Sequence, residues 1–360
     1  MVFNSIFFIF CFLPVFMLIY YLVPGKLRNL LLFLGSLIFY AWGEPVYVIL
    51  MLFSSIFNYY MGTELERLYY DDRKQKINLI FSIIINLAVL VFFKYYGFLL
   101  NTIGGIIGIH IPHPELSLPI GLSFYTFRNL SYLFDIYLSK VSAQRNFLTF
   151  AVYSTMFPYT SAGPIVRYTD IETQLKQRTI NISKFGIGAE LFVKGLAKKV
   201  LLADNLSVLY SSICGHPQMS VFTSWLGILA YTMQLYFDFS GYSDMAIGLG
   251  KMLGFDFNKN FDYPYISTSV SEFWRRWHIS LGSWFRDYIY IPLGGNRVST
   301  LKHIRNILVV WALTGLWHGA SWNFVLWGVY YGLFLLLEKF VLQKYLKKIP
   351  SCFALYTLCL

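Results

Sequence analysis

The stretch from Arg305 to Val341 reads RNILVVWALTGLWHGASWNFVLWGVYYGLFLLLEKFV. It is long and apolar enough to cross a bilayer, since a spanning helix needs about 20 apolar residues. Its length favours two spans that meet at a turn near Ala320 and Ser321. The stretch nevertheless contains His318, and a titratable side chain at membrane depth indicates a functional site by default. The chemistry that suits such an imidazole is proton transfer.

The whole chain shares this apolar character. It has 360 residues, of which 57% are hydrophobic and 13% are charged, and its mean hydropathy is +0.55. A soluble domain could not solvate such a surface. The sequence therefore predicts an all-α, polytopic integral membrane protein. The first apolar run, Val2 to Val23, lacks the basic region and cleavage site of a signal peptide, so we expect a retained span.

The net charge of +11 does not indicate a nucleic-acid partner, because basic residues accumulate in the cytoplasmic loops of membrane proteins. The cysteines have no paired spacing, so neither disulfides nor a zinc site is expected; they are Cys11, Cys214, Cys352 and Cys359. His110 and His113 have a ligand-like separation, but Pro112 lies between them and no third ligand is near. We therefore expect no bound metal.

Basic and non-basic loops alternate along the first part of the chain. The apolar runs between them are Val2–Val23, Asn29–Trp42, Val46–Met61, Ile77–Tyr96 and Leu118–Leu138. The positive-inside rule then places the N-terminus on the extracytoplasmic side and the basic loops in the cytoplasm. The expected location is an inner membrane, which the chain crosses several times.

The alternation ends at the next segment, residues 147–165, because basic residues follow it. Prolines and glycines interrupt this segment, which is tolerated at membrane depth only beside protein or a water-filled cavity. We expect it to be re-entrant. Lys184 to Ile213 is amphipathic and suits the cytoplasmic interface. Ser269 to Tyr290 reads as one Trp- and Arg-rich helix, tilted or re-entrant, before a tight loop at residues 291–296.

Two histidines are the candidate chemical groups. Gly315 and Gly319 flank His318 and would let a substrate approach closely. Burial would keep its imidazole neutral and able to accept a proton. The alternative is a packed histidine that hydrogen-bonds a neighbouring helix. His278 follows FWRRW, and that run could equally form an interfacial helix whose arginines reach phospholipid headgroups.

Acidic residues inside apolar runs admit a structural explanation. Asp238 and Asp244 could pair with arginines, among them Arg275, Arg276 and Arg286, and hold helices together. Arg128 and Asp135 invite the same interpretation. Ser321 has no neighbour that would activate it as a nucleophile.

Several long motifs resemble the membrane-bound O-acyltransferase family, and most closely its bacterial polysaccharide O-acetyltransferase branch. They follow the family's order along the chain and are residues 118–127, 162–168, 236–250, 260–265, 273–295 and 315–328. The YIPLGGN run at 290–296 favours this branch over teichoic-acid D-alanyltransferases. The resemblance implies one transmembrane domain over residues 1–360, a helical bundle with re-entrant segments and a central tunnel. Relatives usually continue with further spanning helices, so we expect this chain either to be a short member or to lack C-terminal helices found in relatives.

The resemblance also implies a mechanism. The family's catalytic histidine falls on His318 and its second histidine on His278. His318 would take the proton of an acceptor hydroxyl, while His278 would orient the acyl group or stabilise the oxyanion. The expected tunnel residues are Trp274, Arg276, Trp317 and Asp238.

The same resemblance suggests substrates and partners. The donor would be acetyl-CoA or another acyl thioester from the cytoplasm, with no bound cofactor. Lys194, Lys198 and Lys199 could attract its phosphates, although the positive-inside rule explains them equally well. The acceptor would be a surface polysaccharide, reached through an extracytoplasmic acetyltransferase partner. D-alanyl transfer, acylation of a protein or lipid, and a transporter or channel remain alternatives.

Overall fold

The computed structural model describes residues 1–114, 116–216 and 218–346, and every regular element within them is a helix. The prediction of an all-α chain is confirmed for these residues. Cys352 and Cys359 lie outside the described residues, as does the rest of the last apolar run, Cys352 to Leu360.

Three helical stretches are long and apolar enough to cross a membrane. They are α3 (Val48–Arg67), α4 (Asp72–Ile107) and the continuous helix Trp322–Tyr345. Other expected spans are shorter helices, such as α2 (Arg28–Ala41) with 14 residues. A straight helix of that length rises only about 21 Å, against a hydrocarbon core of about 30 Å. The predicted crossing of those segments stays a prediction.

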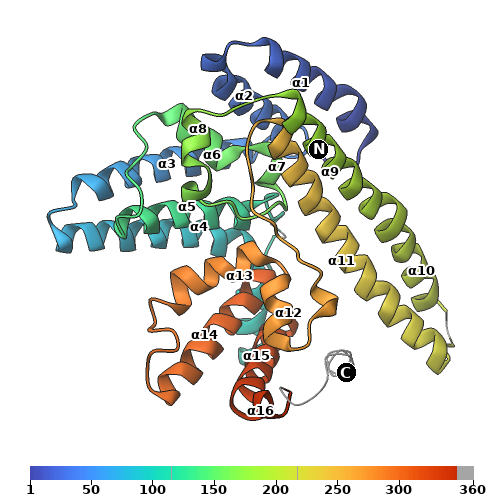
Figure 1. The fold of residues 1–360 in the computed structure, drawn as a ribbon. Helices are drawn as coiled ribbons and strands as arrows, with labels where there is room; N and C mark the ends of the chain where they lie inside the picture. The colour runs from blue at the N-terminus through green and yellow to red at the C-terminus, as the bar shows by residue number, and fades with distance from the viewer. Residues whose placement is uncertain (115, 217, 347–360) are drawn as a thin grey trace. The chain divides into compact units, whose positions relative to one another are not determined.

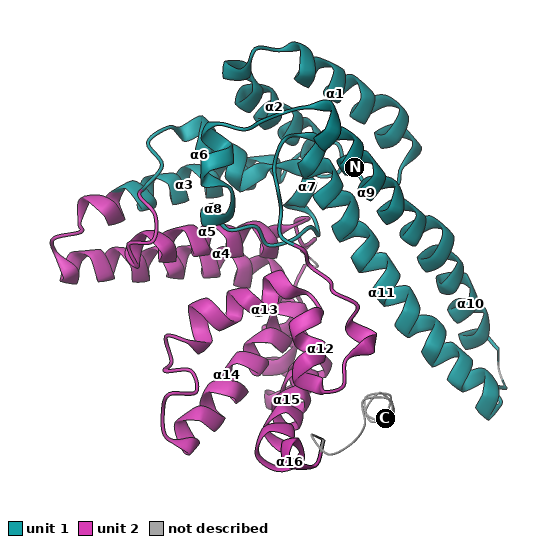
Figure 2. Ribbon diagram, in the orientation of Figure 1, with its two compact units in different colours: residues 1–63, 143–258 teal, residues 64–142, 259–360 magenta. Residues whose placement is uncertain are grey.

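The chain forms two compact units, each built from two separate segments (Figure 2). Unit 1 contains residues 1–63 and 143–258, and unit 2 contains residues 64–142 and 259–360. The prediction of one domain over residues 1–360, with a central tunnel, stays a prediction.

Unit 1 is organised around the long helix α11 (Val221–Met252), which lies beside α9 (Ile182–Ala197) and α10 (Asp204–Cys214) (Figure 1). Glycines allow the close contact. A Cβ on Gly195 would lie 2.5 Å from the carbonyl oxygen of Gly241, so no larger residue fits there. The remaining helices of the unit are η1 (Phe8–Phe12), α1 (Leu13–Leu22), η2 (Gly25–Leu27), α2, most of α3, α6 (Phe147–Thr155), α7 (Phe157–Thr160), α8 (Tyr168–Lys176) and η3 (Lys198–Ala203).

Ion pairs join the same helices of unit 1. Asp238 binds Lys199 at 2.8 Å and Asp244 binds Lys198 at 2.6 Å. The aspartates do hold helices together, but the prediction of arginine partners was wrong. A lysine of η3 neutralises each carboxylate. These pairs also occupy two of the lysines that could have attracted donor phosphates.

The broken segment of unit 1 follows its proline and glycine pattern. Helix α6 ends before Met156, α7 is one turn long, and the chain is irregular until α8 begins at Tyr168. The predicted interruption is confirmed. Its return to the cytoplasmic side of a membrane stays a prediction.

Unit 2 carries both candidate histidines. Its hairpin of α14 (Thr300–His318) and α15 (Trp322–Leu337) turns at residues 319–321, as predicted. Helix α4 packs against α5 (Leu122–Tyr137), and the indole N–H of Trp284 donates to the Phe127 carbonyl oxygen at 3.0 Å. The other helices are η4 (Pro264–Ile266), α12 (Val270–Arg276), α13 (Ile279–Phe285), η5 (Arg286–Tyr290), η6 (Glu338–Leu342) and α16 (Gln343–Leu346).

Candidate active site

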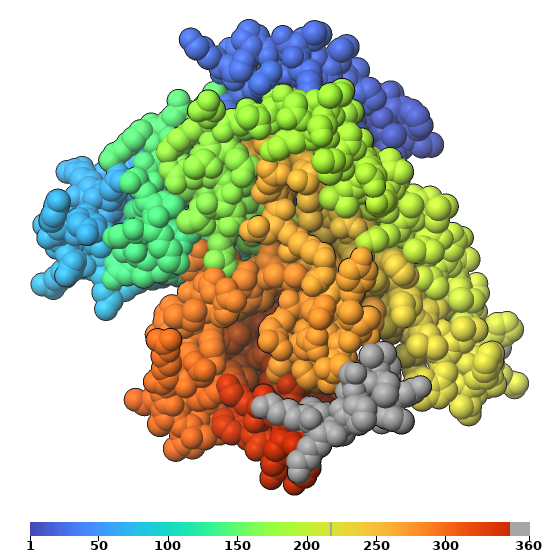
Figure 3. All heavy atoms as spheres, in the orientation of Figure 1, coloured from blue at the N-terminus to red at the C-terminus, as the bar shows by residue number. Residues whose placement is uncertain are grey.

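A cavity of about 860 Å³ lies within unit 2. Its walls come from α12, α13, α14 and the end of α15, and they include Trp274, His278 and His318. The space-filling view shows the surface hollowed where the orange residues of α12, α13 and α14 meet red residues near the end of α15 (Figure 3). The two histidines, 40 positions apart in the chain, therefore line one cavity.

His278 lies at a break that the sequence did not predict. The expected single helix from Ser269 to Tyr290 is interrupted there, because α12 ends at Arg276 and α13 begins at Ile279. His278 adopts left-handed backbone angles, φ 45° and ψ 54°. Such a conformation costs about 1–3 kcal/mol in a residue with a side chain, and such strain concentrates at functional sites. The break turns the imidazole to a position that a continuous helix would not give it.

Asn260 holds the His278 ring. Its side-chain oxygen lies 3.2 Å from His278 Nδ1, and it accepts hydrogen bonds from the backbone N–H and the hydroxyl of Ser280 at 3.2 and 2.9 Å. The Asn260 carbonyl also accepts from the N–H of Ile279 at 2.9 Å. Asn260 is 1% exposed and His278 is 3% exposed, so the arrangement is shielded from water.

His318 is the last residue of α14. Its ring stands edge-on to Trp327, with centroids 5.0 Å apart, and edge-on to Trp317 at 5.1 Å. Trp317 also meets His278 edge-on at 5.8 Å. One indole therefore contacts both imidazoles and sets their separation. Trp317 is not itself among the residues that line the cavity.

Helix α4 holds the end of α14. The Lys94 ammonium donates a hydrogen bond to the carbonyl oxygen of Trp317, and the Tyr95 hydroxyl donates to that of Leu316. Helix C-termini leave carbonyls without intrahelical partners and carry partial negative charge, so a cation suits this position. These contacts fix the turn that presents His318.

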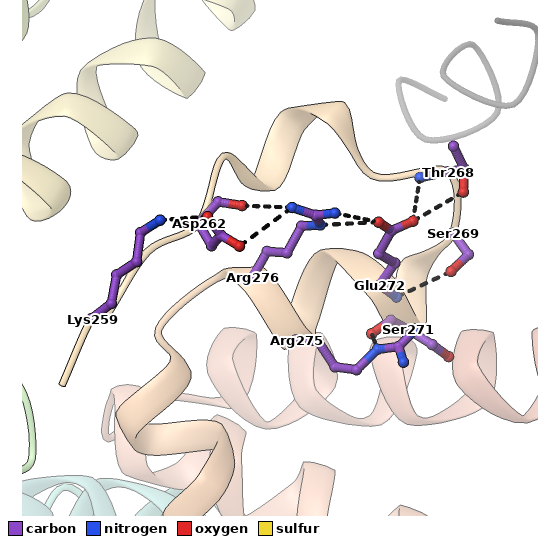
Figure 4. A network of polar contacts seen from close by, with 8 residues as sticks. All are labelled: Lys259, Asp262, Thr268, Ser269, Ser271, Glu272, Arg275 and Arg276. Carbon is purple, nitrogen blue, oxygen red and sulfur yellow. Dashed lines mark hydrogen bonds and ion pairs between the residues drawn. The ribbon is translucent and has the colours of Figure 1, made fainter. Parts of the chain in front are cut away.

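A polar network connects α12 with the segment before it (Figure 4). Arg276 binds Glu272 at 2.8 Å and Asp262 at 3.5 Å. Glu272 in turn accepts hydrogen bonds from the backbone N–H and the hydroxyl of Thr268, at 3.0 and 2.9 Å. The backbone hydrogen bond from Thr268 is the main cause that lowers the pKa of Glu272. Arg276 thus ties two segments together, whereas Arg275 and Arg286 line the cavity.

A buried carboxylate at the start of η6, directly after α15, caps α12. Glu338, 6% exposed, accepts a hydrogen bond from the N–H of Val270 at 2.6 Å and another from that of Ser271 at 3.2 Å. The N–H groups at a helix start have no intrahelical partners, and an acidic side chain there is favourable. Glu338 therefore fixes the helix that leads into His278 against the helices that carry His318.

Trp274 lines the cavity among other aromatic rings. It stands edge-on to Trp311, Trp327 and Tyr331, with centroids 4.8, 5.6 and 5.0 Å away. Its buried indole N–H makes no hydrogen bond within the described part of the chain. A buried donor without a partner is uncommon in proteins, and this N–H is available to a ligand.

The structure thus sorts the candidate residues by place. His278, His318 and Trp274 line the cavity, and Trp317 contacts both histidines. Asp238 belongs to unit 1, where it pairs with Lys199. The roles of all of them stay predictions.

Sequence reasoning missed Asn260, Lys94 and Glu338. Lys94 had a signal, because a lysine inside the apolar run Ile77–Tyr96 deserves the same suspicion as an intramembrane histidine. Glu338 could have been found in the same way, because it is a charged residue within the apolar stretch Arg305–Val341. Asn260 had none beyond its place in a matched motif.

Comparison with known proteins gives a consistent picture. The model of the membrane-bound O-acyltransferase family matches residues 46–348. A probable alginate O-acetylase AlgI from Pseudomonas aeruginosa is 45% identical over 343 residues, which are 94% of this chain and 66% of that protein. A peptidoglycan O-acetyltransferase from Helicobacter pylori is 35% identical, covering 94% of this chain and 70% of that protein.

A more distant relative is a teichoic acid D-alanyltransferase from Bacillus subtilis, 29% identical over 66% of this chain and 63% of its own length. The chain spans about two thirds of the length of the alginate O-acetylases that it matches. A family model over most of the chain and relatives above 30% identity over 94% of it settle the classification. The chain is a member of the membrane-bound O-acyltransferase family.

Proposed function

We propose that this membrane protein is an O-acyltransferase that moves an acyl group, most simply acetyl, from a thioester toward hydroxyls of an exported cell-surface polysaccharide. The observation that carries the proposal is that His278 and His318 line the same cavity in unit 2. The similarity to alginate and peptidoglycan O-acetylating proteins supports the acyl group and the acceptor class.

His318 would act as the general base. An acceptor hydroxyl attacks the thioester carbonyl carbon, and its proton passes to the neutral imidazole of His318. The tetrahedral intermediate then collapses, the C–S bond breaks, and His318 returns the proton to the leaving thiolate. The products are an ester and a free thiol, so no further reactant is needed.

The surroundings favour such a reaction. Two tryptophan rings stand beside His318. With a substrate in the cavity they would limit the access of water, which hydrolyses thioesters and weakens electrostatic interactions. The unpartnered N–H of Trp274 is a donor that could stabilise the negative charge on the thioester oxygen. Stabilisation of that charge is usually the largest contribution to catalysis in acyl transfer.

The route of the acyl group is part of the proposal. The donor, acetyl-CoA or a similar thioester, enters from the cytoplasm, and the acceptor is reached on the outer face of the inner membrane through an extracytoplasmic acetyltransferase. The N-terminus lies outside, as the alternation of basic loops favours.

D-alanyl transfer is the second candidate within the family. The identity of 29% over 66% of the chain to a teichoic acid D-alanyltransferase, against 45% over 94% to the alginate O-acetylase, favours acetylation. The donor separates the two, because D-alanylation would leave acetyl-CoA unused.

Ester-linked acetyl on the surface polysaccharide tests the proposal in cells carrying the wild type, His318→Ala or His278→Ala. His110→Ala is the matched control, because His110 is exposed in a loop. We expect loss of acetyl in the first two variants at equal membrane abundance, and wild-type acetylation in the control. Full acetylation in His318→Ala would overturn the assignment of the base. Release of free thiol from acetyl-CoA by purified protein separates an enzyme from a transporter, which would release none.

A further inference from the structure

The side-chain oxygen of Asn260 is identified by its partners. The backbone N–H of Ser280 can only donate, and it lies 3.2 Å from the Asn260 atom assigned as oxygen. The opposite amide orientation would place an NH₂ group against that N–H, which sets two donors against each other. The Ser280 hydroxyl, 2.9 Å from the same atom, donates to it as well.

This orientation decides the protonation of His278. The Asn260 oxygen has no hydrogen to give, and it lies 3.2 Å from Nδ1. A bare Nδ1 lone pair facing it would be repelled, so Nδ1 carries the hydrogen and donates. In a neutral imidazole the other nitrogen, Nε2, then has the lone pair and accepts.

The Nδ1 edge of the His278 ring has an identified partner. The Nδ1 edge faces Asn260, which is not among the lining residues, whereas His278 itself lines the cavity. Two donors of Ser280 fix the orientation of the Asn260 amide, and the amide oxygen then selects the ring state with the hydrogen on Nδ1.

We infer that Asn260 is a positioning residue that holds His278 as the Nδ1–H tautomer and so makes Nε2 a hydrogen-bond acceptor for a hydroxyl of the acyl acceptor. This role in transfer rests on the proposed function. Neutral His278 in this state has no Nε2 hydrogen to donate to a thioester oxygen, so it orients the acceptor and does not stabilise an oxyanion. The attacking hydroxyl gives its proton to His318, so the hydroxyl that His278 binds is a second one on the acceptor.

Nitrogen-15 NMR of histidine-labelled protein tests the tautomer without any reaction. The His278 signals are assigned by comparison with His278→Gln. We expect the Nδ1–H pattern in the wild type and in the control Asn258→Ala, whose residue is exposed. In Asn260→Ala the pattern should be lost. An Nε2–H tautomer or a doubly protonated ring in the wild type would overturn the inference, whatever the activity.

Acyl transfer from acetyl-CoA tests the positioning role. Asn260→Ala should lower the rate about tenfold to a hundredfold, the usual effect of losing a residue that orients a working histidine. Asn260→Asp keeps the oxygen acceptor and should recover most of the transfer rate. Asn260→Ala combined with His278→Gln should be no slower than His278→Gln alone, because the two residues act as one unit.

Additive losses in that double variant, or a fully active Asn260→Ala, would reduce Asn260 to a structural residue. An inactive wild type would count against the proposed function, and the NMR result would still decide the tautomer.

Discussion

The Lys94 ammonium donates a hydrogen bond to the carbonyl oxygen of Trp317, the residue immediately before His318. The two residues are 223 positions apart in the chain. Lys94 also lies 5.6 Å from the centre of the Trp317 ring, within the range of a cation–π contact. A cation on a helix that can cross the membrane is costly to bury, and here it serves to fix the candidate base.

Lys94→Met should therefore weaken both stability and transfer. Loss of a hydrogen bond to a charged group costs about 2 kcal/mol, and the last turn of α14 loses its support. Thermal unfolding in detergent and acetyl-CoA thiol release measure the two effects. Lys76→Met is the control, since Lys76 is exposed on the same helix. A Lys94→Met protein with wild-type stability and rate would show that the contact is dispensable.

Glu338→Ala should detach the start of α12 from the α14–α15 hairpin. The N–H groups of Val270 and Ser271 lose their acceptor, at a cost of about 1–2 kcal/mol for a lost helix cap. We expect a lower unfolding temperature and slower transfer, because α12 carries Trp274 and leads into His278. Glu190→Ala, which breaks an exposed ion pair on α9, should change neither. Equal behaviour of the two variants would contradict the capping role.

Trp274→Phe tests the unpartnered indole N–H. Phenylalanine keeps most of the aromatic packing and removes only the donor. If that N–H stabilises charge on the thioester oxygen, kcat should fall by about a hundredfold with little change in KM for the donor. Trp225→Phe, at an exposed position, is the control. A change in KM alone would assign Trp274 to binding.

Gly328→Ala should be strongly destabilising, because α14 and α15 touch through their backbones. A Cβ on Gly328 would lie 3.1 Å from the Cα of Gly315 and closer still to the Trp311 carbonyl oxygen. Overpacking of this kind costs about 1–3 kcal/mol. Gly105→Ala in α4 meets open space and should be neutral or stabilising by up to about 1 kcal/mol. The unfolding temperatures of the two variants show whether Gly328→Ala is destabilised and Gly105→Ala is not.

The lowered pKa of Glu272 predicts a pH dependence of stability. The hydrogen bond from the Thr268 N–H favours the carboxylate, so folding is stabilised at pH values above the ordinary pKa of glutamate, about 4.3. That stabilisation is lost as the pH falls through the lower folded-state value. The difference in the free energy of unfolding between wild type and Glu272→Gln should be largest near neutral pH and should disappear in acid. A difference that stays constant down to pH 3 would show that ionisation of Glu272 plays no part.

The sequence by itself determined the features that local chemistry encodes. Apolar runs predicted an all-helical membrane chain, Pro158, Gly163 and Pro164 predicted the broken segment, and the stretch around His318 predicted a hairpin. These features can be predicted from the sequence because each depends on residues within one or two helical turns.

Only the tertiary structure decided what surrounds the two histidines. The left-handed turn at His278 depends on Asn260 and Ser280, and the cap on α12 depends on Glu338, 68 positions after Val270. Such contacts form between segments that approach only when the helices pack, and a buried polar group takes whichever partner lies within reach. The pattern of one segment cannot reveal that partner, because the geometry that selects it belongs to the packed fold.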